Sequence, residues 1–245
     1  MSYSLILGGT KGLGFALARE SALRGIEPIV TGRSAADPGV AASLPQNAIR
    51  IAMDLTDDES IDEALRNLDQ YTVDYFFWNA GIWPGRVPFR QLSVTDIDDV
   101  IATNFTGPLK LLRRFHETRV SQGRPYRLVA ISSASAWLVR KNETVYCASK
   151  DAQAVFVLNF ADELAQELPG SQATIFYPGG MKTEIFKGNV QDTSGYMEPA
   201  SVAKAVWDEV MGQKEICREV HIIRNKEKND GSFTIEYGPR PRGVQ

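Results

Sequence analysis

The chain contains little cysteine and little histidine. Its 245 residues include two of each, and Cys147 and Cys217 lie far apart without the neighbours that a metal-binding pattern needs. This scarcity favours neither a disulfide framework nor a metal site, and it is typical of a reduced, cytoplasmic setting. A serine hydrolase would need a histidine base, yet only His116 and His221 are available and no G-x-S-x-G pattern occurs. That class of enzyme is therefore disfavoured.

Long apolar runs and an excess of positive charge are also missing. The opening residues, MSYSLILGG, carry no basic stretch, and no apolar run approaches the roughly 18 residues of a membrane span. The formal net charge is −3, which disfavours nucleic acid or an anionic membrane as the main partner. The composition is otherwise that of an ordinary globular protein, so we expect a small-molecule partner, no signal peptide and no membrane span.

Short apolar segments alternate with longer amphipathic segments along the whole chain. The pattern predicts strands over 3–7, 28–31, 48–53, 73–78, 127–131, 173–177 and 219–223, and helices over 13–24, 57–68, 96–118, 146–168 and 199–211. Thr56 and Glu59 form an expected capping box, and the weakly patterned segments 34–47 and 182–198 are expected to be loops.

This alternation predicts an α/β protein with a single-domain, Rossmann-type doubly wound fold. We expect a seven-stranded parallel sheet with helices on both faces. The single domain would span 1–245, with a core over about 4–224 and a C-terminal extension over 225–245. Within the extension, the stretch FTIEY is a candidate for one additional strand.

Glycines mark the first strand-to-helix turn. In LILGGTKGLGFALA, Gly8, Gly12 and Gly14 stand directly between the first expected strand and the first expected helix. Glycines at such a turn let the backbone approach a pyrophosphate, which the amino end of the following helix attracts. The spacing is G-x-x-x-G-x-G rather than the commoner G-x-G-x-x-G. The position of these glycines predicts a dinucleotide site.

A basic residue replaces the acid that usually follows the second strand. An acid there would hold the ribose 2′-hydroxyl of NAD, but this chain has Gly32 and Arg33, and Lys11 lies in the glycine loop. Two cations suit a 2′-phosphate, so the prediction is NADP(H). The alternative is that both residues are solvated surface charges.

Tyr146 and Lys150 are four residues apart in an expected helix, so their side chains share a face. A nearby ammonium lowers the pKa of a phenol and makes it a better proton carrier at neutral pH. A Y-x-x-x-K spacing is common on helix surfaces, so this pair alone decides little.

Together these motifs resemble the short-chain dehydrogenase/reductase family over about residues 4–224. The matching stretches are GGTKGLG, Asp54 in MDLT, NAG from Asn79 to Gly81, NFTG with Asn104, ISS with Ser133, YCASK with Tyr146 and Lys150, and YPGGMKT with Thr183. Ser133 precedes Tyr146 by thirteen residues, as in the family.

The resemblance implies a carbonyl–alcohol oxidoreductase. Tyr146 would be the general acid and base, Lys150 would lower its pKa and hold the nicotinamide ribose, Ser133 would bind the substrate oxygen, and Asn104 would hold a relay water. The alternatives are that Asn104 is only a helix kink and that Ser132 or Ser135 replaces Ser133. The implied cofactor contacts are Gly8, Thr10, Lys11, Gly12, Leu13, Gly14, Arg33, Asp54, Leu55, Asn79, Ala80, Gly81, Tyr146, Lys150, Pro178, Gly179 and Thr183, with no metal ligand.

Three further expectations follow. An apolar, cyclic or aromatic substrate would lie among Trp83, Trp137, Leu138, Phe186, Tyr196 and Met197. The resemblance implies a homodimer or homotetramer through the helices at 96–118 and 146–168. A non-catalytic NADP-binding regulator on the same fold is the rival function, although such a protein would be expected to lack the Tyr or the Lys.

Overall fold

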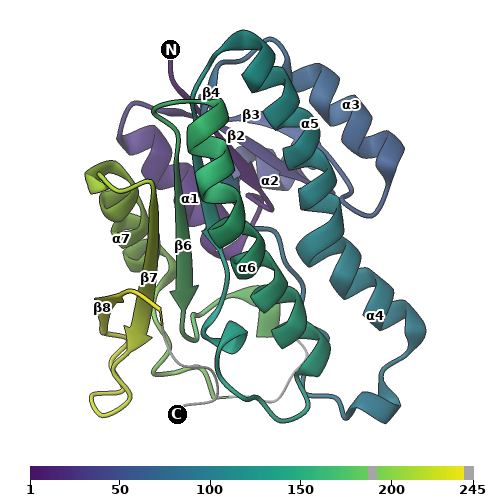
Figure 1. Cartoon of the computed structure of the whole chain (residues 1–245). Helices are drawn as coiled ribbons and strands as arrows, with labels where there is room; N and C mark the ends of the chain where they lie inside the picture. Colours follow the sequence, from purple (N-terminus) through teal and green to yellow (C-terminus); the bar gives the residue numbers. More distant parts are fainter. Residues whose placement is uncertain (187–191, 240–245) are drawn as a thin grey trace.

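The computed structural model describes residues 1–186 and 192–239 and contains one eight-stranded sheet in that part of the chain (Figure 1). The strand order is β3-β2-β1-β4-β5-β6-β7-β8; the first seven are parallel and β8 is antiparallel to β7. The strands are β1 Tyr3–Leu7, β2 Glu27–Gly32, β3 Ile49–Ala52, β4 Val73–Trp78, β5 Arg127–Ile131, β6 Gln172–Pro178, β7 Cys217–Arg224 and β8 Phe233–Tyr237.

Helices cover both faces of the sheet, as the alternating pattern predicts. The helices are α1 Gly12–Leu23, α2 Pro38–Ser43, α3 Asp58–Leu68, α4 Val94–Ile101, α5 Gly107–Gln122, α6 Thr144–Glu167 and α7 Pro199–Gly212. Helices α3, α5 and α6 pack on one face through a buried apolar core, and α1 and α7 pack on the other face through a second core. None of these described helices has the length and apolar character to cross a bilayer.

The chain reverses its direction of winding at β1. This strand pairs with β2 on one side and with β4 on the other, so the connections that follow β1 and β4 diverge and leave a crevice at the carboxyl ends of the strands. Ligands of doubly wound folds bind in this crevice. The glycine loop and the Asn79–Gly81 segment both lie at this edge, because each directly follows one of the two strands.

Several local predictions were wrong. The expected helix over 96–118 is two helices joined by a π-helical turn, η2 Ala102–Thr106. The expected loop over 34–47 contains α2, and the loop 182–198 contains the short 3-10 helix η4 Glu184–Phe186. Asp57 rather than Thr56 caps α3, because the Thr56 hydroxyl donates a hydrogen bond to Asp54 instead. The other 3-10 helices are η1 Phe89–Gln91 and η3 Ala134–Ala136.

The stretch FTIEY does form an additional strand, β8, so the sheet has eight strands instead of the predicted seven. Strand β8 pairs with the outer edge of β7, and Figure 1 shows it at the margin of the sheet. The loop between β7 and β8 contains Asn229 and Gly231, both with positive φ. Residues 240–245 of the expected C-terminal extension lie outside the described residues.

Candidate active site

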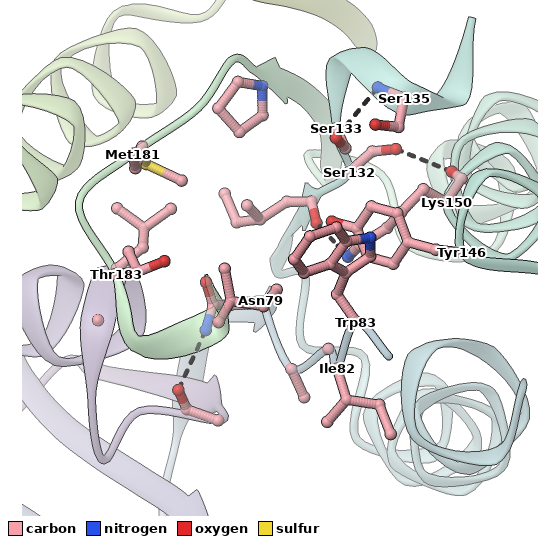
Figure 2. Close-up of a pocket in the computed structure, with 18 of the residues that line it drawn as sticks. Asn79, Ile82, Trp83, Ser132, Ser133, Ser135, Tyr146, Lys150, Met181 and Thr183 are labelled. Carbon is pink, nitrogen blue, oxygen red and sulfur yellow. Dashed lines mark hydrogen bonds between the residues drawn. The ribbon is translucent and has the colours of Figure 1, made fainter. Parts of the chain in front are cut away.

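A cavity of about 840 Å³ opens at the carboxyl edge of the sheet. Every residue that the sequence predicts to contact a cofactor lines this cavity, and Ser133 lines it as well. Figure 2 shows Ser133, Tyr146 and Lys150 on one side, with Met181 and Thr183 opposite. The structure therefore brings together, in one space, segments that are distant in the sequence.

The glycine loop adopts a backbone that side chains would obstruct. Gly8 and Gly12 have φ of +71° and +55°, which residues with a side chain rarely adopt. A Cβ on Gly14 would overlap the carbonyl oxygen of Gly8. The Asn79 amide fixes the loop, because its Nδ2 donates to the carbonyl oxygens of Leu7 and Gly8 at 3.2 and 3.1 Å (Figure 2).

The amino end of α1 has no capping group of its own. Lys11 occupies the N-cap position without a side-chain hydrogen bond, and the first turn contains no acidic residue. The first backbone amides of a helix have no partner within the helix, and the helix dipole makes this end partly positive. The arrangement suits the pyrophosphate of a dinucleotide.

The predicted 2′-phosphate site lies beside this loop. Arg33 is exposed and lines the cavity, and the Nζ of Lys11 lies 3.9 Å from an exposed Glu184 carboxylate. Burial raises the pKa of Asp54, but hydrogen bonds from Thr56 and the charge of Arg33 outweigh it and hold that pKa below its ordinary value. Arg33 therefore lies near enough to Asp54 for its charge to act on that carboxylate.

Tyr146 is half-buried at the wall of the cavity. Burial raises the pKa of Tyr146 to about 12, a hydrogen bond with Ser133 acts in the opposite direction, and the charge of Glu143 raises the pKa further. None of these contributions comes from Lys150, and its lowering of this pKa stays a prediction. At neutral pH the phenol is protonated and can donate a proton.

Lys150 is directed toward the sheet. Its Nζ donates hydrogen bonds to the carbonyl oxygen of Ile131 at 2.9 Å and to Gln153 Oε1 at 3.2 Å. Burial lowers the pKa of Lys150 to about 7. The Ser132 hydroxyl donates to the Lys150 carbonyl oxygen, which leaves Ser133 as the serine that hydrogen-bonds to Tyr146.

Asn104 lies behind the cavity wall, in the π-helical turn. Its Oδ1 accepts a hydrogen bond from the Ile82 amide at 2.7 Å, and its Nδ2 donates to the Ile82 carbonyl oxygen and to Ser149 Oγ, each at 3.0 Å. The side chain is fully buried. Asn104 therefore both marks a helix irregularity and joins the segment after β4 to α6.

The expected substrate end is largely aromatic. Trp83, Trp137, Leu138, Phe186 and Tyr196 line the cavity as predicted, but Met197 does not. Met197 is fully buried in the core on the α1 and α7 face. Met197 forms an isolated β-bridge with Met181, sixteen residues earlier. The local sequence does not reveal this contact.

Sequence reasoning missed the charged residues at this end, namely Arg86, Arg140, Glu143, Arg224 and Lys226. No motif contains them. Arg224 could have been found from its position, since it ends β7 and the carboxyl ends of parallel strands gather at the same edge. Among the described residues, no group of three or more His, Cys, Asp or Glu is placed to hold a metal ion.

Comparison with known proteins gives concordant results. A family model described as short chain dehydrogenase matches residues 3–194. The chain is 32% identical over 186 residues to a serine 3-dehydrogenase of Agrobacterium fabrum, covering 74% of this chain and 72% of that protein. Two solved structures share the fold. A 3-ketoacyl-(acyl-carrier-protein) reductase from Brucella melitensis complexed with NADH has a TM-score of 0.78 and 20% identity over 90% of this chain and 96% of that one. A closed form of serine dehydrogenase complexed with NADP+ has a TM-score of 0.71 and 24% identity over 89% and 94%.

The family model covers most of the chain, and the relative is 32% identical over 186 residues. The chain therefore belongs to the short-chain dehydrogenase/reductase family of oxidoreductases.

Proposed function

We propose that the protein is an NADP(H)-dependent oxidoreductase that interconverts a carbonyl compound and its alcohol, with Tyr146 as the general acid and base. One observation carries the proposal: the uncapped glycine loop and the hydrogen-bonded Tyr146–Ser133 pair line the same cavity. A phosphate-binding turn and a proton donor are thereby present in one enclosed space.

The glycine loop and the Asn79–Gly81 segment would hold a nicotinamide cofactor, which would provide hydride transfer to a carbonyl carbon or from an alcohol. In reduction, Tyr146 donates its proton to the carbonyl oxygen as that oxygen gains charge, and Ser133 donates a hydrogen bond to the same oxygen. The raised pKa of Tyr146 keeps the proton in place until the oxygen becomes basic. Lys150 lines the same cavity and donates hydrogen bonds to Ile131 and Gln153.

The test is Tyr146→Phe, assayed with NADPH over a panel of ketones, aldehydes and quinones. We expect kcat to fall by at least about a hundredfold, the usual contribution of a general acid, while NADPH binding stays unchanged. Tyr71→Phe, outside the cavity, is the control. Retention of more than a tenth of the activity would exclude Tyr146 as the proton donor. NADPH binding without turnover by the wild type would favour the rival regulatory function.

The preference for NADP(H) rests on the chain's own residues, because the two structural relatives were solved with different cofactors. Arg33 offers a planar fork for the 2′-phosphate and Lys11 a point charge, and Gly32 stands where an acid would repel it. We expect NADPH to bind about tenfold to a hundredfold tighter than NADH. Titration of both cofactors into the wild type and into Arg33→Ala with Lys11→Ala measures this. Equal dissociation constants in the wild type, or a preference kept by the double variant, would refute it.

A further inference from the structure

The substrate end of the cavity has an excess of unpaired positive charge. Arg140, Arg224 and Lys226 line it, and none forms an ion pair within 4 Å among residues 1–186 and 192–239. The carboxylates of the lining are engaged elsewhere: Glu143 pairs with Arg86 at 2.9 Å, and Glu184 lies 3.9 Å from Lys11. This part of the cavity is therefore poised to attract an anion.

Arg224 is the best placed of these cations. It is half-buried at the end of β7, and its guanidinium carbon lies 4.6 Å from the centre of the Tyr196 ring. The charge of Arg224 contributes to lowering the pKa of the exposed Asp192 carboxylate, but this carboxylate accepts its hydrogen bonds from Ser194. An aromatic face holds a guanidinium in place without neutralising it. The planar fork remains available for two parallel hydrogen bonds to a carboxylate.

Backbone packing fixes the orientation of Tyr196. Its ring lies against Gly180, where a Cβ would come within 2.6 Å of the ring. Phe186 contacts Tyr196 edge-on with centroids 5.5 Å apart, and Trp83 contacts Phe186 in the same way at 5.3 Å. An aromatic wall thus runs from Trp83 to Arg224 along the cavity.

The sheet order separates Arg224 from the predicted 2′-phosphate site. Arg33 follows β2 and Arg224 ends β7, and β1, β4, β5 and β6 lie between them. At about 4.8 Å per strand, the two arginines start about 24 Å apart. Arg224 is therefore not placed to bind the same phosphate as Arg33. Ser133 follows β5, only two strands from β7, so Arg224 starts roughly 10 Å from the strand end that Ser133 follows.

We propose that the substrate is a carbonyl compound that carries a carboxylate several bonds away from the carbonyl, with an apolar or aromatic portion between them, and that Arg224 binds this carboxylate. The inference rests on the proposed function. The carbonyl lies at Ser133 and Tyr146, the apolar portion lies along Trp83, Phe186 and Tyr196, and the carboxylate reaches the guanidinium. A short acid such as serine carries its carboxylate only two bonds from the reacting carbon and lacks the apolar portion that would contact the aromatic wall.

The first experiment compares a keto acid with its neutral analogue. Benzoylbutyrate, its methyl ester and the shorter benzoylformate are reduced with NADPH by the wild type, Arg224→Gln and Arg224→Lys. We expect kcat/KM for benzoylbutyrate to exceed that of the ester by at least about tenfold, as one charged hydrogen-bonded contact provides. Arg224→Gln should bring this ratio close to one by lowering kcat/KM for benzoylbutyrate, and Arg224→Lys should restore part of it.

Arg218→Gln is the matched control. Arg218 also lies on β7 and faces an aromatic ring, Tyr237, at 5.9 Å, but it is paired with Glu209 and Glu215 and does not line the cavity. Its replacement should leave the ratio of acid to ester unchanged.

A second experiment does not depend on turnover. Calorimetry measures the binding of phenylvalerate and of phenylvaleramide to the wild type and to Arg224→Gln, each with NADPH present. Preference for the acid by at least about tenfold, lost in Arg224→Gln, supports the inference. The inference is overturned if acid and amide bind equally or if the preference for the acid survives in Arg224→Gln. It is also overturned if benzoylformate or serine is turned over better than benzoylbutyrate. Reduction of ester and acid at equal rates would contradict the role of Arg224 and would still support the proposed function. If no carbonyl compound is reduced, the proposed function fails and the calorimetry alone decides the role of Arg224.

Discussion

Lys150 shows how the fold changes the chemistry of a single residue. In water its ammonium is charged at neutral pH, but burial in the cavity wall lowers its pKa from 10.5 to about 7. Below about pH 7 the group is protonated in both the folded and the unfolded chain, and the cost of burying the charge is fully present. Between about pH 7 and 10.5 only the unfolded chain holds this proton, so the free energy of unfolding rises with pH through that window.

Lys150→Met tests this prediction, because methionine has a similar shape and no charge. Relative to this variant, the wild type should gain roughly 2–4 kcal/mol in the free energy of unfolding between about pH 7 and pH 10. Urea unfolding at several pH values measures the difference. Lys214→Met, at an exposed position, should show no such change. A difference between wild type and Lys150→Met that is constant with pH would contradict the buried-amine description.

The loop between β7 and β8 is an element that supports the substrate wall. It contacts the segment before α7 through Asn229, whose side-chain oxygen lies where a Cβ on Gly195 would be. Gly231 similarly approaches the Tyr196 carbonyl oxygen. The loop is held by hydrogen bonds from the Asn225 amide to the Ser232 carbonyl oxygen and from the Asn229 amide to the Asn225 carbonyl oxygen. The loop between β7 and β8 therefore packs against the backbone of the segment that contains Tyr196.

Gly195→Ala should consequently lower the free energy of unfolding by about 1–3 kcal/mol through overpacking, and should raise KM for substrates through displacement of Tyr196. Asn229→Gly removes the obstructing side chain and suits the φ of +48° at that position. In the double variant most of the loss should disappear. A double-mutant cycle of urea unfolding measures the coupling. If the effects of the two substitutions simply add, the contact between residues 195 and 229 is not the cause of the destabilisation.

At the scale of the whole molecule, α6 presents apolar surface outward. Val155 and Leu158, which share one face of α6 at a spacing of three residues, are 39% and 38% exposed. The family resemblance implies that the helices corresponding to α4, α5 and α6 pair with their copies. We propose a homodimer or homotetramer that covers this face.

Light scattering at micromolar concentration should therefore give a mass above the 27.1 kDa of one chain. Val155→Glu with Leu158→Glu should shift the protein to the monomer while the circular dichroism spectrum is unchanged, because charged groups disfavour a dry interface. Met211→Glu alters an exposed apolar residue on α7 and should leave the mass unchanged. A monomeric wild type would refute the assembly.

The sequence by itself determined the order of the elements and the phosphate-binding turn. Both depend on local patterns: apolar periodicity distinguishes strand from helix, and Gly8, Gly12 and Gly14 permit a backbone that few other residues adopt. The details that the sequence predicted wrongly involve contacts between distant residues, which local patterns do not contain. In the π-helical turn, the Asn104 side chain hydrogen-bonds to Ile82 and Ser149, which are distant in the sequence.

Only the tertiary structure decided which residues meet at the cavity and how they ionise. Met197 is turned into the core, Lys150 donates to Ile131, and Arg224 lies on Tyr196 without a carboxylate partner among the described residues. These contacts follow from strand order and register, which bring residues together across long stretches of chain. Burial then sets the pKa values of Tyr146 and Lys150, because the cost of a charge depends on everything packed around it and not on neighbours in the sequence.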